Sequence, residues 1–329
     1  ELGLAYEPHR VTLDDADVRS PEFLSLNPNN KIPAIIDPDG PGHVRAFDPQ
    51  IWLDPNGRLW WFWAQAAKHG IDAVTWCMVT ENPEAQDPDW SEPRALAPGV
   101  MMGKPIVLSD GTWAFPISDW EGRRLKAPGA ATAGFWVSED EGETFSKRGA
   151  AHVPVEHRQY DEHMIIERKD GTLWMLVRTL YGIGESFSSD GGRTWTKVAP
   201  PKIPHPVARF FITRLQSGNL LLVKHGSMEK QTGRSHLTAF ISADDGRSWE
   251  GGLLLDERKK VSYPDGQQAE DGTIYITYDY KRTSAQQIFF ASFREQDARA
   301  GEAVTDALRL RQEVSQGRLP TNDNADGES

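Results

Sequence analysis

The sequence has a single cysteine and lacks any long apolar run. Cys77 alone cannot form an intrachain disulfide or a cysteine-based metal cluster, and we expect neither a metal site nor a cofactor. Without a stretch of about 18 apolar residues, the chain is not expected to cross a membrane as a helix. The N-terminus also lacks the charged and apolar regions of a signal peptide. We therefore favour a cytoplasmic location, with truncation before Glu1 as the alternative.

Positive charge is also scarce. The 36 Lys and Arg residues face 48 Asp and Glu residues, which leaves a formal net charge of −12. Nucleic acids and anionic membranes require a basic surface, so we expect neither as a partner. A local basic pocket within the acidic surface is compatible with this balance.

What the sequence does contain is an internal repeat. The same eight-residue pattern occurs at 138–145 (SEDEGETF), 188–195 (SSDGGRTW) and 242–249 (SADDGRSW), with the serines 50 and 54 residues apart. Ser and Asp close turns through side chain to backbone hydrogen bonds, Gly supplies a positive φ, and the last aromatic packs between sheets. Repeats of this period are typical of β-propellers. The aspartates are expected to be structural, because the turn uses their hydrogen bonds.

A second repeat marks tight hairpins. Turn dipeptides flanked by alternating apolar residues occur at Asn56-Gly57, Asp110-Gly111, Asp170-Gly171, Ser217-Gly218 and Asp271-Gly272. Together with the eight-residue repeats, they predict an all-β propeller over residues 44–313, with five blades of roughly 50 residues. A short helix is expected from Glu295, and residues 314–329, rich in Asn, Asp, Gly and Ser, are expected to form a disordered tail.

The first 43 residues have a different character. The run 26–35 (LNPNNKIPAI) resembles the turn before the cis-proline in the thioredoxin-like half of glutathione transferases, with Pro33 as that proline. The resemblance implies a partial α/β fragment ahead of the propeller. The residues that carry the chemistry of that family are missing, so we expect residues 1–43 to be a fusion segment without function.

Candidate site residues follow from the propeller geometry. The first strand of every blade begins at one rim of the axis, so residues at one offset before each hairpin turn should converge. Eight positions before the turn lie Asp48, Met102, Glu162, Arg209 and Tyr263, and Lys104 shares a strand face with Met102. Four of these five offset residues are polar or ionisable, which favours a binding site over core filling. A solvated rim is the alternative.

Two further arginines extend the candidate site. Arg178 ends one apolar strand and Arg234 begins another. A buried guanidinium is rare without an anion, and its planar fork suits a carboxylate. The pattern therefore predicts an acidic sugar as ligand. His163 is a further candidate, although Glu162 and His163 alternate along a strand, so one of them is expected to pack between blades.

Residues 45–293 resemble the sialidase superfamily, whose six-bladed propellers carry the eight-residue repeat known as the Asp box. The segments 161–167 (DEHMIIE) and 170–178 (DGTLWMLVR) are similar to those that hold the catalytic glutamate and one carboxylate-binding arginine of that family. The resemblance implies that Glu162 is a base, that Arg178 and Arg234 bind the substrate carboxylate, and that Tyr263 is the nucleophile. A neutral nucleophile suits a substrate whose own carboxylate would repel Asp or Glu.

The first blade of that family has no counterpart here. Its Arg-Ile-Pro motif and acid/base aspartate are missing, and residues 47–53 (FDPQIWL) resemble the start of the second blade. Five blades of an expected six are therefore visible. We expect a sialidase-like exo-glycoside hydrolase that acts on a terminal acidic sugar and is impaired by the missing blade. The alternatives are a polysaccharide lyase that acts on a uronate-containing glycan and a carbohydrate-binding propeller without catalytic activity.

Overall fold

The computed structural model describes residues 45–66, 72–120 and 132–316. The expected transferase-like segment over 1–43 lies outside them. The chain divides into two compact units, the first ending at Lys202 and the second beginning at Ile203. In the described ranges no helix is long and apolar enough to cross a membrane.

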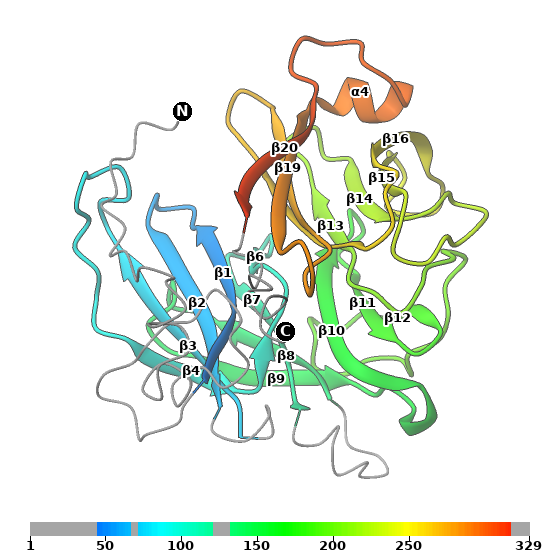
Figure 1. The fold of residues 1–329 in the computed structure, drawn as a ribbon. Helices are drawn as coiled ribbons and strands as arrows, with labels where there is room; N and C mark the ends of the chain where they lie inside the picture. Colours follow the sequence, from blue (N-terminus) through cyan, green and yellow to red (C-terminus); the bar gives the residue numbers. More distant parts are fainter. Residues whose placement is uncertain (1–44, 67–71, 121–131, 317–329) are drawn as a thin grey trace, which may run out of the picture. The chain divides into compact units, whose positions relative to one another are not determined.

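The first unit holds three antiparallel sheets (Figure 1). The first sheet has the order β1-β2-β3-β4, with strands Arg45–Leu53, Leu59–Ala66, Val74–Thr80 and Arg94–Pro98. The second is built from Val100–Met101 (β5), Ile106–Val107 (β6), Trp113–Ser118 (β7), Ala133–Ser138 (β8) and Ser146–Ala151 (β9). The third has the order β10-β11-β12, with strands Arg158–Glu167, Leu173–Thr179 and Gly182–Ser188, preceded by a single helical turn at Val155–His157 (η1).

The second unit holds two sheets of four strands each. One is formed by β13 to β16, at Phe211–Arg214, Leu220–His225, Leu237–Ser242 and Glu250–Asp256. The other is formed by β17 to β20, at Val261–Gln268, Ile274–Tyr280, Gln287–Phe293 and Arg309–Gln316. The only α-helix among the described residues, α4 (Glu295–Ala300), packs against β15 and β16 (Figure 1). Strand β20 runs three residues into the segment expected to be a tail.

The five sheets confirm the all-β propeller fold and its five visible blades. Each begins with the hairpin that its turn dipeptide predicts. In the first sheet, Gly57 has φ 82° and its N–H donates to the carbonyl of Asp54 at 3.0 Å. That left-handed conformation is the reason for glycine at this position.

The three eight-residue repeats close their turns in the same way. In the first, the hydroxyl of Ser138 donates to Asp140 at 2.7 Å and accepts the N–H of Gly142 at 2.8 Å. The carboxylate of Asp140 then accepts the backbone N–H and the hydroxyl of Thr144 at 2.9 and 2.6 Å. Equivalent bonds recur in the other two repeats. The aspartates are structural, as the sequence predicts.

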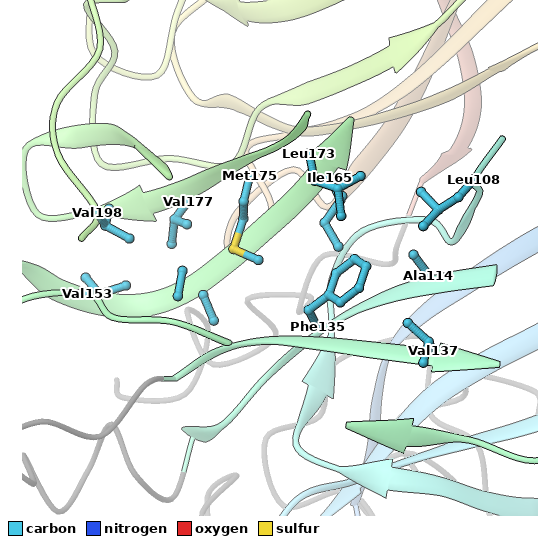
Figure 2. Close-up of a cluster of buried hydrophobic side chains, with 12 residues drawn as sticks. Leu108, Ala114, Phe135, Val137, Val153, Ile165, Leu173, Met175, Val177 and Val198 are labelled. Carbon is cyan, nitrogen blue, oxygen red and sulfur yellow. The ribbon is translucent and has the colours of Figure 1, made fainter. Parts of the chain in front are cut away.

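Apolar layers join neighbouring sheets of the first unit. Figure 2 shows the layer between the second and third sheets, where Phe135 of β8 and Met175 of β11 are fully buried. The layer between the first and second sheets centres on Trp60, Phe62 and Phe115. Aromatic side chains thus fill the spaces between sheets, and burying each such ring contributes about 1.5 to 3 kcal/mol.

Candidate functional site

A strained bulge recurs near the predicted site positions. In β1 the chain advances three residues, from Phe47 to Gln50, while β2 advances two, and Asp48 adopts φ 53°. The same irregularity occurs in β17, where Tyr263 has φ 53°. A wider one occurs in β10, where Asp161, next to Glu162, has φ 52°. Non-glycine residues in this region are uncommon, and such strain clusters at functional sites.

In the first unit, Glu162 and Arg178 form a buried ion pair. Arg178 Nη1 donates to both carboxylate oxygens of Glu162, at 2.9 and 3.0 Å. The side chains are 5% and 4% exposed. The guanidinium also lies 5.2 Å from the ring centroid of Tyr160, which favours its charge. The structure thus brings together two residues to which the sequence analysis gave separate roles.

The bulge beside this pair is held by buried hydrogen bonds. The carboxylate of Asp161 accepts the hydroxyl of Thr132 at 2.5 Å, and its carbonyl accepts the hydroxyl of Ser118 at 2.6 Å. The indole of Trp120 donates to the carbonyl of Tyr160 at 3.0 Å. These contacts fix the backbone on both sides of Asp161, so the position of Glu162 is determined by the neighbouring sheet.

His163 packs between sheets. It is 2% exposed, and its ring nitrogens lie 3.0 Å from the carbonyl of Asp161 and 2.8 Å from that of Gly134 in β8. Burial lowers its pKa to about 4, although the two carbonyls favour the protonated ring. Both ring nitrogens of His163 thus face backbone carbonyls of the protein. Its assignment to substrate binding remains a prediction.

Two other predicted residues also lie in the first unit. Lys104 Nζ donates to the carbonyl of Ile51 in β1 at 2.9 Å. Asp48 occupies the bulge of the same strand. Their assignment to substrate binding remains a prediction.

In the second unit, two guanidinium groups lie close to the ring of Tyr263. Arg282 Cζ is 4.3 Å and Arg234 Cζ 5.9 Å from the centroid of its ring. Arg282 Nε in turn lies 3.6 Å from a carboxylate oxygen of Asp279. Burial raises the pKa of Asp279, while Arg282 and Arg234 oppose that shift. Guanidinium groups at these distances attract the ring through cation–π contacts and help to fix its position.

Arg209 belongs to the same unit and lies just before β13. It is 5% exposed, and its Nη2 lies 3.9 Å from Asp265 of β17. Arg234 Nη2 donates to the carbonyl of Val207 at 3.2 Å, which places Arg234 beside the segment that leads to Arg209. We name Arg209, Arg234, Tyr263, Asp265, Asp279 and Arg282 the tyrosine cluster.

Arg282 and Asp279 are not among the residues that the sequence pattern predicted. Asp279 lies near the end of β18 and Arg282 follows two residues after that strand, and Asp279 pairs in register with Ser262, next to Tyr263. The register of the hairpin could have identified Asp279 from the sequence, because a residue opposite Ser262 must lie near Tyr263. Among the described residues, no group of three or more His, Cys, Asp and Glu side chains is placed to hold a metal ion.

Comparison with known proteins agrees with the fold. A curated sialidase of Bacteroides fragilis (strain YCH46) is 27% identical over 248 residues, which is 68% of this chain. The match spans 42% of the length of that relative. A leech intramolecular trans-sialidase, solved with 2,7-anhydro-Neu5Ac, has a TM-score of 0.54 and 20% identity, over 70% of this chain and 37% of its own.

The family assignment rests on a match to most of the chain. Residues 41–276 match the model of the BNR repeat-like domain, a range that includes all three eight-residue repeats and all five hairpin turns. The glutathione-transferase-like segment falls almost wholly outside that range. The chain therefore belongs to the BNR repeat-like family, with the fold of a sialidase-like β-propeller.

Proposed function

We propose that this protein is an exo-acting glycoside hydrolase of sialidase type that removes a terminal acidic sugar. The observation that carries the proposal is Tyr263, held in a strained bulge with Arg282 and Arg234 on its ring. A tyrosine becomes a useful nucleophile when its phenolate is stabilised and a base takes its proton. The sialidase relative in Bacteroides fragilis supports the same substrate class.

The proposal gives the other residues the roles that the resemblance implies. In the second unit, Tyr263 attacks the anomeric carbon and Arg234 binds the sugar carboxylate, while Glu162 and Arg178 of the first unit keep the base and carboxylate-binding roles that the resemblance implies. Guanidinium groups suit this task because their paired N–H groups match the two carboxylate oxygens. The strain at Tyr263 helps to orient the phenol before substrate arrives.

A second candidate function, sugar binding without cleavage, is favoured by one contact. Both oxygens of Glu162 accept hydrogen bonds from Arg178, so this carboxylate is already engaged within the protein. In this case the same groups would recognise an acidic sugar and release it unchanged.

The experiment compares the full chain with its Tyr263→Phe variant on an aryl glycoside of N-acetylneuraminic acid. We expect release of the aryl group by the wild type and a loss of at least about a thousand-fold in the variant, because covalent catalysis needs the hydroxyl. Equal turnover in the two proteins would show that Tyr263 is not the nucleophile. Binding without release supports the second candidate. A product absorbing in the near ultraviolet, formed from a uronate-containing glycan, would instead identify a lyase.

A further inference from the structure

One edge of the Arg209 guanidinium makes no hydrogen bond to the residues that the structure describes. The side chain is 5% exposed, yet neither Nε nor Nη2 has a hydrogen-bond partner among them. These two nitrogens point to the same side of the planar group, which is the side that binds a carboxylate through two parallel bonds. A buried donor without a partner carries a free-energy cost, so such a group in a folded protein requires an explanation.

The nearest acid does not satisfy this edge. Asp265 Oδ1 lies 3.9 Å from Arg209 Nη2, which is beyond hydrogen-bond distance. Arg258 of the same unit shows the saturated alternative, since its Nε and Nη2 donate to Asp256 at 3.0 and 2.6 Å. Asp265 thus partly compensates the positive charge of Arg209, while Nε and Nη2 of Arg209 keep their capacity to donate hydrogen bonds.

Charge in the tyrosine cluster also leaves room for an anion. Its three arginines and two aspartates carry a formal charge of +1, so one added carboxylate would neutralise it. Arg234 is tied to this segment through its bond to the carbonyl of Val207, while Asp265 is two residues beyond Tyr263 in β17. A carboxylate at Arg209 would therefore be held beside the tyrosine.

We propose that Arg209 is a carboxylate-binding residue whose Nε and Nη2 receive the acid group of a uronic or nonulosonic sugar. This inference rests on the proposed function for the identity of the ligand as an acidic sugar, but binding at Arg209 does not require that the sugar be cleaved. Arg209 binds the carboxylate through the edge that carries Nε and Nη2. The carboxylate of Asp265 competes weakly with the ligand for the positive charge of Arg209.

The test is calorimetric titration of the full chain with N-acetylneuraminate and glucuronate, with glucose as the neutral match for glucuronate. We expect at least one of the two acids to bind, and glucose not to bind. Arg209→Gln should weaken acid binding about ten- to a hundred-fold, as expected for the loss of charged hydrogen bonds. Arg209→Lys should recover part of the loss, because lysine keeps the charge without the fork. Asp265→Asn should tighten binding a few-fold.

Two controls separate recognition from structure. Arg214→Gln removes another arginine of this unit, one paired with Asp245 at 2.9 Å, and should leave acid binding unchanged. Thermal unfolding of Arg209→Gln should show no loss of stability, because no protein hydrogen bond is broken at Nε or Nη2. A structural arginine would instead lower the unfolding temperature while leaving the affinity of the folded protein intact.

Each outcome decides between the two proposals. Acid binding that depends on Arg209, in a chain that cleaves no sialoside, upholds this inference and overturns the proposed function. Cleavage with unchanged KM and unchanged acid affinity in Arg209→Gln overturns this inference alone. Failure of the wild type to bind either acid also overturns it.

Discussion

Arg178 binds both carboxylate oxygens of Glu162 through the single nitrogen Nη1, with both side chains at least nine-tenths buried. Truncating one partner of such a pair leaves the other charge buried and uncompensated, which costs about 3 to 5 kcal/mol. Glu162→Gln should therefore lower the free energy of unfolding by about 3 kcal/mol, measured by denaturant titration. The matched control is Glu139→Gln, whose side chain is 74% exposed in its pair with Arg148 and should cost less than about 1 kcal/mol.

The double variant Glu162→Gln with Arg178→Met completes this test. Removing both charges leaves no buried uncompensated group. The double variant should therefore lose about 2 kcal/mol less free energy of unfolding than the two single variants lose together. Additive losses would show that the two side chains do not stabilise each other.

Arg282 is expected to support catalysis through Tyr263. Its guanidinium lies 4.3 Å from the ring centroid and holds the ring in place through a cation–π contact. Arg282→Gln should lower kcat about ten-fold with little change in KM, since a cation over a ring is worth about 0.5 to 2 kcal/mol. Lys281→Gln is the matched control, because Lys281 lies over the neighbouring Tyr280 instead. A change in KM alone would assign Arg282 to substrate binding.

The repeat turns should make the protein sensitive to acid. Hydrogen bonds from Thr194 and Ser188 lower the pKa of Asp190 to about 2 from an ordinary value of 3.8. A lowered folded-state pKa contributes stability above pH 4 that is lost as the pH falls toward 2. Asp190→Asn should therefore be less stable than the wild type at neutral pH, and the difference should shrink between pH 4 and 2 in thermal melts. Asp87→Asn, at an exposed loop position, should leave the melts unchanged.

Gly192 is expected to tolerate no side chain. A Cβ there would lie 2.3 Å from the ring of Phe135, at a φ of +87°. Gly192→Ala should destabilise the protein by about 2 to 4 kcal/mol, from overpacking together with backbone strain. Gly171→Ala, at φ +79° with nothing within 4 Å, isolates the strain and should cost about 1 kcal/mol. Equal losses in the two variants would mean that the contact with Phe135 is unimportant.

Local turn chemistry made most of the fold predictable from sequence. The dipeptide at Asp170-Gly171 and the repeat at 188–195 each specify a turn through bonds within a few residues. The candidate site was less predictable, because its contacts depend on strand register. The register that pairs His163 with Val177 brings Glu162 to Arg178 at the next positions, while no sequence pattern marked the irregular stretch of β10 beyond them. The engagement of His163 by Gly134 likewise depends on a strand of the neighbouring sheet.

The recurring bulge has the same backbone conformation in different sheets, whichever side chain occupies it. Asp48 and Tyr263 occupy the same backbone conformation in different sheets, although one side chain is an acid and the other a phenol. The conformation is set by the register of the hairpin rather than by the residue that adopts it. The blades that carry this bulge therefore hold one backbone position constant while its side chain can differ, and a new specificity can arise by substitution there without a new arrangement of strands.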